Sequence, residues 1–234
     1  MTDGTESPPR PKRSPAAQRI LREAMRLFAE RGYERTSIAD IQAAVGLAPG
    51  SGALYKHFPS KEAVLSAGLD EFVAGAERAR ELIRTVPGPA EQALGTLGRA
   101  AMRMLDDDRD VLRIMYRELD AFPALRDEVR ERRMQGTYAT LADWLRERAD
   151  RGEMRVEDPE ATAAVVLGSI TSFKVFQALL GEPPARLDDE RFVRAWLRMM
   201  VRGLGVEAGA RADGDDAADA GDADDPADSD DANG

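Results

Sequence analysis

Apolar residues recur at helical spacing along almost the whole chain, and this periodicity restricts the fold more than any other feature. Ile20, Ala24, Leu27 and Phe28 form the first stripe, at intervals of three and four residues. Glycine or proline follows most of the stripes where a helix is expected to end, as Gly32 does here. No run alternates between apolar and polar residues with the period of a strand. The sequence therefore predicts an all-α protein.

These stop signals divide the chain into an N-terminal domain of three helices and a larger domain of about six. We expect four segments: a flexible Pro-rich arm at 1–14, the first domain at 15–61, the second at 62–205 and a disordered tail at 206–234. The three short helices are predicted from 15, over 38–45 and from 49, and the others over 61–84, 94–105, 111–119, 124–150, 159–180 and after 187.

Charge is distributed unevenly along the chain, which carries a formal net charge of −10. Residues 1–61 hold ten Lys and Arg against six Asp and Glu, a net of +4. The segment 206–234 holds one Arg and eleven acids, a net of −10, in a sequence dominated by Asp, Ala and Gly. The acidity therefore belongs to the tail, and the basic excess lies at the front, where it can face nucleic-acid phosphates.

The chain has no cysteine, which excludes disulfides, thiolate metal sites and a cysteine nucleophile. We find no apolar run of membrane-spanning length and no secretion signal, so we expect a cytoplasmic, nucleoid-associated protein. The lone His57 lacks the partners of a metal site, and the acids at 106–108 and 188–190 fit helix starts better than a cation site. Without a nucleophile–base pair or phosphate loop, we expect neither an enzyme nor a cofactor.

Two short helices joined through a glycine turn give the first domain the layout of a helix-turn-helix. Ser37 and Asp40 have the spacing of a capping box at the start of the second helix, and Gly46 ends it. Ser60 is the expected cap of the helix that follows the domain. The free N–H groups at such helix starts can bind phosphate oxygens.

The next segment has the properties of a recognition helix that enters the major groove. Small residues open it, Leu54 is an inward anchor, and cationic or hydroxyl side chains follow. Two glycines near its start each disfavour a helix by about 1 kcal/mol against alanine, so we expect part of it to form only on DNA. The predicted contacts of this segment are Pro49, Gly50, Ser51, Gly52, Tyr55, Lys56 and His57.

Residues 19–65, about a fifth of the chain, resemble the N-terminal DNA-binding domain of the TetR/AcrR family of transcriptional regulators. The resemblance is most specific in the run LYKHFPSKE at 54–62. One departure is that this chain has two residues more between Gly46 and Tyr55 than is usual in the family, which bears on base readout. The other matching residues are Leu27, Phe28, Gly32, Tyr33, Thr36, Ser37, Ile41 and Leu47.

The resemblance implies a homodimeric repressor that leaves a pseudo-palindromic operator when a small, largely apolar ligand enters the second domain. By motif position it also assigns phosphate contacts to Thr36, Ser37, Tyr55, His57 and Lys61. The alternative is a DNA-organising or partner-controlled DNA-binding protein without a small effector.

Methionines and aromatic residues on the fifth to eighth predicted helices are either core residues or the lining of a ligand cavity. Arg113, Gln135 and Thr171 are candidate polar contacts to such a ligand. The candidate lining residues are Met104, Met115, Tyr116, Met134, Tyr138 and Phe173.

The helices around 159–180 and 188–203 carry a possible dimer interface. Small residues keep the first of them slim, and Val166, Ile170 and Phe173 form an apolar seam that Trp196 and Met199 extend. Packing within one subunit is the alternative for this seam. The acidic tail is either a solubilising appendage or a competitor of DNA for the basic arm.

Overall fold

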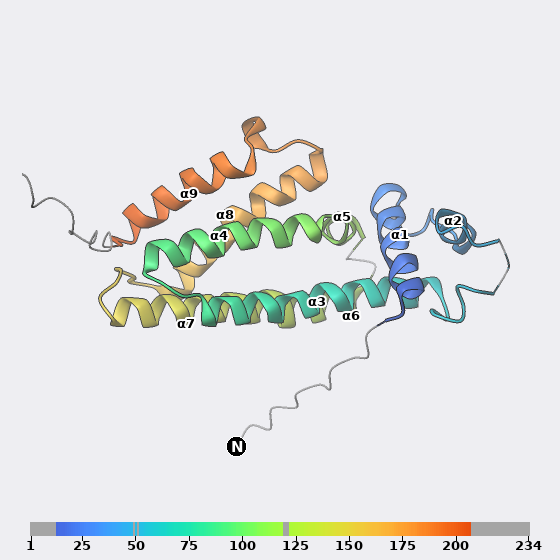
Figure 1. The fold of residues 1–234 in the computed structure, drawn as a ribbon, viewed down its shortest axis with the longest axis horizontal. Helices are drawn as coiled ribbons and strands as arrows, with labels where there is room; N and C mark the ends of the chain where they lie inside the picture. Colours follow the sequence, from blue (N-terminus) through green and yellow to red (C-terminus); the bar gives the residue numbers. More distant parts are fainter. Residues whose placement is uncertain (1–12, 49, 51, 119–121, 207–234) are drawn as a thin grey trace, which may run out of the picture.

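The computed structural model describes residues 13–48, 50, 52–118 and 122–206, and this part of the chain contains helices and turns but no strand (Figure 1). The predicted all-α fold is confirmed. The elements are α1 (Pro15–Arg31), α2 (Ile38–Ala44), α3 (Lys61–Thr85), α4 (Ala90–Asp107), α5 (Arg109–Glu118), α6 (Pro123–Glu128), the π-helix η2 (Val129–Gln135), α7 (Gly136–Asp150), α8 (Pro159–Leu180), the 3-10 turn η3 (Pro184–Arg186) and α9 (Asp189–Gly203).

The ends of α1 and α2 follow from local sequence signals. Gly32 ends α1 at φ +93°, a backbone angle that favours glycine, and its N–H donates to the Phe28 carbonyl at 2.9 Å. Ser37 starts α2, where its Oγ accepts the N–H of Asp40 at 3.1 Å and the Asp40 carboxylate accepts the N–H of Ser37 at 2.8 Å. The predicted capping box is therefore confirmed.

The recognition helix predicted from residue 49 is not a regular helix in this structure. Gly50 and Gly52 have φ values of +75° and +65°, in the left-handed region, which a right-handed helix cannot contain. A tight turn over 53–57 takes its place, closed by the N–H groups of His57 and Phe58 on the Leu54 carbonyl. Two glycines in left-handed geometry thus replace the predicted first turn of the helix.

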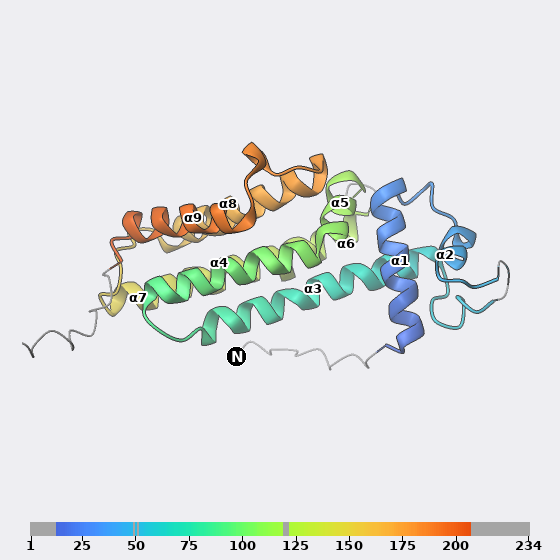
Figure 2. The same cartoon turned by 45° about the horizontal axis from the view of Figure 1, so that its top comes forward.

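Helix α3 connects two hydrophobic cores and is the longest element (Figures 1 and 2). Its first turns pack on α1, where Val64 and Leu65 are fully buried in the N-terminal core with Leu54. Its far end contributes Ile83 to the core formed with α4, α7, α8 and α9. The boundary predicted between 61 and 62 therefore falls in the first turn of a helix that both cores share.

The single helix predicted over 124–150 is divided into α6, η2 and α7. The middle piece is a π-helix, a wider form that is common at functional sites. The residues on its inner side are Val129, which is buried, and Arg133, which is half-buried. The i→i+5 hydrogen bonds of a π-helix widen its turn and shift the faces of the helix, so periodicity alone did not predict which arginine of this segment lies inside.

Helix α8 is long and apolar enough to cross a membrane by length and composition, which corrects our expectation that no run reaches this length. A core helix of a soluble protein passes the same test, and α8 contributes Val166, Ile170 and Phe173 to the larger core. This seam, predicted as a possible dimer surface, is thus packed within the protomer, as is Trp196, whose Nε1 donates to Ser169 Oγ at 3.0 Å.

Candidate nucleic-acid interface and apolar cavity

The turn over 53–57 lies between α2 and α3, at the end of the molecule away from α9 (Figure 1). Tyr55, Lys56 and His57 are exposed, and Tyr55 presents 54% of its surface to solvent. Leu54 and Phe58 are buried beneath them and anchor the turn to the N-terminal core. The exposed ring and the two basic side chains are therefore free to meet a nucleic-acid backbone.

The loop before this turn presents open backbone at Gly50 and Gly52. A Cβ added at either position would meet no atom within 4 Å, so the surface there is clear. The N–H of Gly50 donates to Oε1 of Gln42 at 3.3 Å, and Gln42 is 2% exposed. Sequence reasoning missed this supporting residue because an amide in a short helix gives no signal of burial. Pro49 and Ser51 were predicted contacts that lie outside the described residues.

Thr36 does not lie where its side chain can reach a phosphate, contrary to the role that the resemblance implies. The residue is completely buried, and its Oγ1 is 2.9 Å from the Gly32 carbonyl and 3.3 Å from the Leu27 carbonyl. The hydroxyl therefore holds the turn between α1 and α2 together. A buried threonine and an exposed one look alike in sequence.

Lys61 is bound within the protein in this structure. Its Nζ donates to the Tyr33 carbonyl at 3.0 Å and lies 4.1 Å from the centroid of the Tyr33 ring. Ser37 and Ser60 are exposed helix caps, and Ser60 Oγ accepts the N–H of Ala63 at 3.0 Å. Of the predicted phosphate contacts, the side chains of Ser37, Tyr55, Lys56 and His57 are thus the exposed ones.

Helix α5 joins the N-terminal domain to the rest of the chain. Arg117 Nη1 donates to the Ala29 carbonyl near the end of α1 at 3.0 Å, and Glu118 Oε1 accepts the N–H of Tyr33 at 2.8 Å. Ile114 of the same helix is buried in the N-terminal core. The last turns of α5 therefore hold the end of α1 by two polar contacts and one apolar contact.

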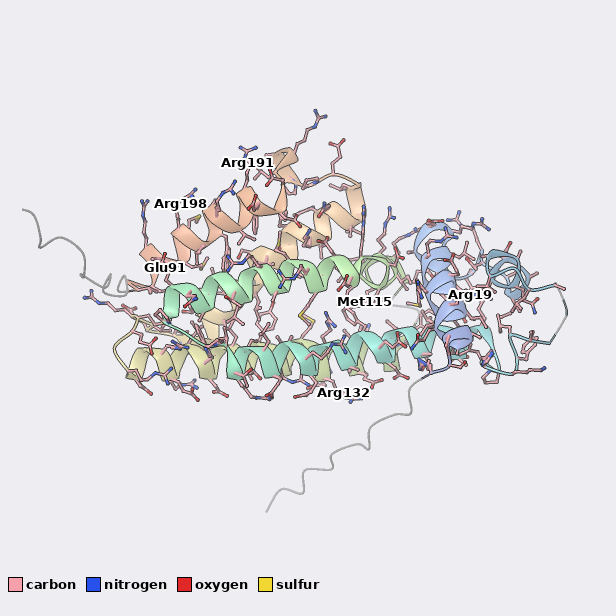
Figure 3. All side chains as sticks on the ribbon, viewed as in Figure 1. Arg19, Glu91, Met115, Arg132, Arg191 and Arg198 are labelled. Atoms are coloured by element: carbon pink, nitrogen blue, oxygen red, sulfur yellow. The ribbon has the colours of Figure 1, made fainter. Side chains whose placement is uncertain are left out.

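The opposite side of α5 borders a cavity of about 210 Å³ inside the helical bundle. Met115 lies between α5 and α3 (Figure 3). Aliphatic and aromatic side chains make up most of the wall, as is typical of small-molecule sites. The lining residues are Phe72, Ala76, Ala79, Leu82, Ile83, Leu94, Leu97, Gly98, Ala100, Ala101, Met104, Leu105, Leu112, Met115, Tyr116, Val129, Arg133, Met134, Thr137, Tyr138, Leu141, Val166, Leu167, Ile170, Thr171 and Trp196.

Most of the ligand contacts predicted from sequence face this cavity. Met104, Met115, Tyr116, Met134 and Tyr138 line it. Phe173 does not line it, because its ring stacks on that of Phe192 with centroids 4.1 Å apart, in the core between α8 and α9. Of the polar candidates, Thr171 lines the cavity, whereas Arg113 and Gln135 do not.

Arg133 is the cavity residue that sequence reasoning missed. Its Nη2 donates to Asp108 Oδ2 at 2.5 Å and its Nη1 to the Phe72 carbonyl, with the guanidinium carbon 3.5 Å from the centroid of the Phe72 ring. Burial lowers the pKa of Arg133 and raises that of Asp108, and their mutual attraction opposes both shifts. The neighbouring Arg130 and Arg132 are exposed, so no sequence signal separates the three.

Two family models match the chain and together span both domains. The model of bacterial regulatory proteins of the TetR family matches residues 20–67. The model of the C-terminal domain of AefR-like transcriptional repressors matches residues 92–203. The first match covers the helix-turn-helix region, and the second covers most of the helices that line the cavity but not α3.

Relatives and solved structures agree with these matches. The transcriptional repressor DhaR of Mycobacterium sp. strain GP1 is 38% identical over 66 residues, 28% of this chain and only 32% of DhaR. The repressor Rv3405c of Mycobacterium tuberculosis is 36% identical over 134 residues, 56% of this chain and 67% of Rv3405c. A regulator from Saccharomonospora viridis, solved with choline, shares the fold at 24% identity and a TM-score of 0.65, over 84% of this chain and all of that one. The chain therefore belongs to the TetR family of bacterial regulatory proteins.

Proposed function

We propose that this chain is a homodimeric transcriptional repressor of the cytoplasm that binds an operator on the chromosome and leaves it when a small molecule occupies the cavity. One observation carries the regulatory part of the proposal: α5 belongs to both sites. Leu112, Met115 and Tyr116 line the cavity, and Arg117 and Glu118, directly after them, hold α1 and the turn that follows it. A displacement of α5 by a ligand would therefore move the N-terminal domain.

The DNA contact is assigned to the turn over 53–57 and the loop before it. Exposed Tyr55, Lys56 and His57 supply phosphate contacts, and Gly50 and Gly52 leave room for close approach of the backbone to the groove. We infer that this segment becomes helical on DNA, because a change of the left-handed angles at Gly50 and Gly52 would allow the turn over 53–57 to extend into a helix.

The dimer contact is assigned to the outer faces of α8 and α9. Val165, Phe176 and Leu180 are 62%, 49% and 74% exposed at spacings that place them along one side of α8, and Met199 of α9 is 68% exposed. Arg191 and Arg198 extend from the outer side of α9 (Figure 3). Large apolar side chains exposed in a row are typical of a surface that a second subunit covers.

Selection of bound fragments from random duplex DNA, at a fixed salt concentration, tests DNA binding. We expect a pseudo-palindrome whose half-sites lie about one helical turn apart. Association that leaves no sequence enriched would favour a DNA-organising protein without an operator. No association with any duplex at low salt would contradict the proposal.

The dimer is tested by light scattering on the full chain after size exclusion. Phe176→Glu should give monomers at micromolar concentration, because it places a charge in the proposed interface. Glu81→Lys, a charge change at an exposed position of α3, is the control and should leave the mass unchanged. A Phe176→Glu protein that keeps the mass of a dimer would show that the contact lies elsewhere.

A further inference from the structure

The cavity wall contains a single charged side chain among the described residues, the guanidinium of Arg133. This charge already has a partner, because Asp108 accepts from Nη2 at 2.5 Å. Asp108 is not part of the cavity wall, so the carboxylate that compensates the charge of Arg133 lies outside the cavity lining. The wall is therefore apolar and electrically balanced before any ligand enters.

Arg133, a residue of the cavity wall, keeps donor capacity beyond its two partners. A guanidinium has five N–H donors, and within the described residues only Asp108 and the Phe72 carbonyl accept from it. The guanidinium also lies on the Phe72 ring, which holds its plane in place. Its Nε has no hydrogen-bond partner in the part of the chain that the structure describes.

Several hydroxyl groups share the wall with Arg133. Thr137, Tyr138 and Thr171 line the cavity, and none of these hydroxyls has a hydrogen-bond partner among the described residues. Burial raises the pKa of Tyr138, so this phenol keeps its proton at neutral pH. The cavity thus presents neutral donors next to one compensated cation.

The balance between Arg133 and Asp108 limits the charge of a ligand. A carboxylate that accepted from Arg133 would compete with Asp108 for this guanidinium, and Arg78 is the further cation that acts on Asp108. A cationic ligand would find no anionic side chain among the described residues of the wall, where the charged group is the cation Arg133. A neutral oxygen acceptor takes the free N–H groups and disturbs neither partner.

We infer that the cavity binds an uncharged, mainly apolar molecule, and that a carbonyl or similar oxygen of this molecule accepts a hydrogen bond from Arg133. The inference deepens the proposed function by naming the class of effector and rests on that function for its regulatory meaning. Arg133 also donates to the Phe72 carbonyl of α3 and pairs with Asp108, which precedes α5. Its contact with a ligand is thus placed next to the helix that leads to the N-terminal domain.

Three probes with the same ring skeleton test the inference in the absence of DNA: tetralin, 1-tetralone and tetralin-1-carboxylate at pH 7. Binding is followed by calorimetry and by tryptophan fluorescence, since Trp196 lines the cavity. We expect 1-tetralone to bind at least about tenfold more tightly than tetralin, the gain from one hydrogen bond to a charged donor. The carboxylate should bind more weakly than the ketone.

The double variant Arg133→Met with Asp108→Asn removes the donor without leaving a buried unpaired carboxylate. It should abolish the preference for the ketone over the hydrocarbon while tetralin still binds. Arg130→Met, an exposed arginine of the same π-helix, is the matched control and should keep the preference.

If the double variant does not fold, the order of the affinities of the unmodified chain for the three probes still tests the inference. Tightest binding of the carboxylate, equal binding of ketone and hydrocarbon, or no binding of any probe would each overturn the inference. The expected order in a protein that binds no duplex would support the inference and contradict the proposed repressor instead.

Discussion

The Glu118 carboxylate accepts the backbone N–H of Tyr33 at 2.8 Å, a contact between residues 85 positions apart. We predict that Glu118→Ala lowers the free energy of unfolding by about 1 to 2 kcal/mol, because it removes a charge-assisted hydrogen bond at a partly buried position. Operator affinity should fall as well, since α1 loses one of its contacts to α5. Urea unfolding and fluorescence anisotropy with labelled operator measure the two effects.

Glu118→Gln separates this contact from the charge itself, because an amide oxygen can still accept from Tyr33. The free energy of unfolding and the operator affinity of Glu118→Gln should each lie between the values of Glu118→Ala and of the unmodified chain. Glu131→Ala removes an exposed carboxylate of the π-helix and should change neither the free energy of unfolding nor the operator affinity. Full operator affinity in Glu118→Ala would show that α5 does not orient the N-terminal domain.

Lys174 is 3% exposed and joins three helices, with Nζ 2.7 Å from Asp106 Oδ1 and 2.6 Å from Asp189 Oδ2. We predict that Asp106→Asn with Asp189→Asn lowers the free energy of unfolding by about 3 kcal/mol, since a buried cation loses its counter-charges. Lys174→Met should change it by less than about 1 kcal/mol, because both carboxylates can turn to solvent. Urea unfolding at pH 7 gives both values.

Arg146 offers a comparison for Lys174, since it also pairs with two carboxylates, Asp143 and Glu160, but on an exposed surface. Arg146→Met should therefore have little effect on unfolding. If the double aspartate variant proves as stable as Lys174→Met, the lysine is not held by its charge partners.

The capping box of α2 makes one contribution to stability dependent on pH. Hydrogen bonds from the Ser37 hydroxyl and then from its backbone N–H lower the pKa of Asp40 below its ordinary value of 3.8. An acid whose folded-state pKa is depressed stabilises the fold above the unfolded value and loses this effect as pH falls through the folded value. We predict that the stabilisation is complete above about pH 5 and disappears in the range below 3.8.

Carboxyl carbon shifts followed by NMR between pH 2 and 6 report this titration directly. Ser37→Ala should move the midpoint of Asp40 up toward its ordinary value, because the hydrogen bond from the Ser37 hydroxyl, the main cause of the depression, is lost. An unchanged midpoint in that variant would contradict the assignment. Asp127, an exposed aspartate of α6, serves as an internal reference in the same spectra.

Lys56 and Lys61 differ in what they can offer to DNA. Lys56 is exposed, so we predict that Lys56→Ala weakens binding to all duplexes about equally and flattens the slope of log K against log salt by about one unit. Lys61 is bound to the Tyr33 carbonyl and ring, so Lys61→Ala should lower the midpoint temperature of thermal unfolding in addition to any effect on DNA binding. A salt titration and a melting curve for each variant separate the two roles.

The parts of the structure that could be predicted are those with local causes. Ser37, Gly32 and Ser60 mark helix ends by hydrogen bonds and backbone angles within a few residues, and these predictions agree with the structure. Five of the six predicted ligand contacts line the cavity, but periodicity did not predict their burial, because Tyr116 and Met134 are 60% and 49% exposed. Periodicity does not specify which neighbour an inward-facing residue contacts, so it did not predict that Phe173 stacks on Phe192 instead of lining the cavity.

The remaining differences have causes that are distant in sequence. Arg133 faces inward because η2 is a π-helix and because Asp108 and Phe72, from other helices, receive its donors. Thr36 is buried by the closing of α1 on α2, which no property of a threonine reveals. The absent recognition helix is a different case, because its glycines were visible in sequence but their left-handed angles were not.

Those glycines give the sharpest prediction about the DNA-binding segment. At Gly52 a Cβ would meet nothing within 4 Å, so Gly52→Ala acts through the backbone alone: it disfavours φ +65° and favours a helix by about 1 kcal/mol. If the segment becomes helical on DNA, operator affinity should rise up to about fivefold, together with helical circular dichroism of the free chain. Gly46→Ala is the matched control, equally open at φ +72° but in the turn that ends α2, which we expect to keep its conformation on DNA, so this variant should only weaken binding. Equal losses of affinity in both variants would mean that the loop keeps its left-handed geometry on the operator.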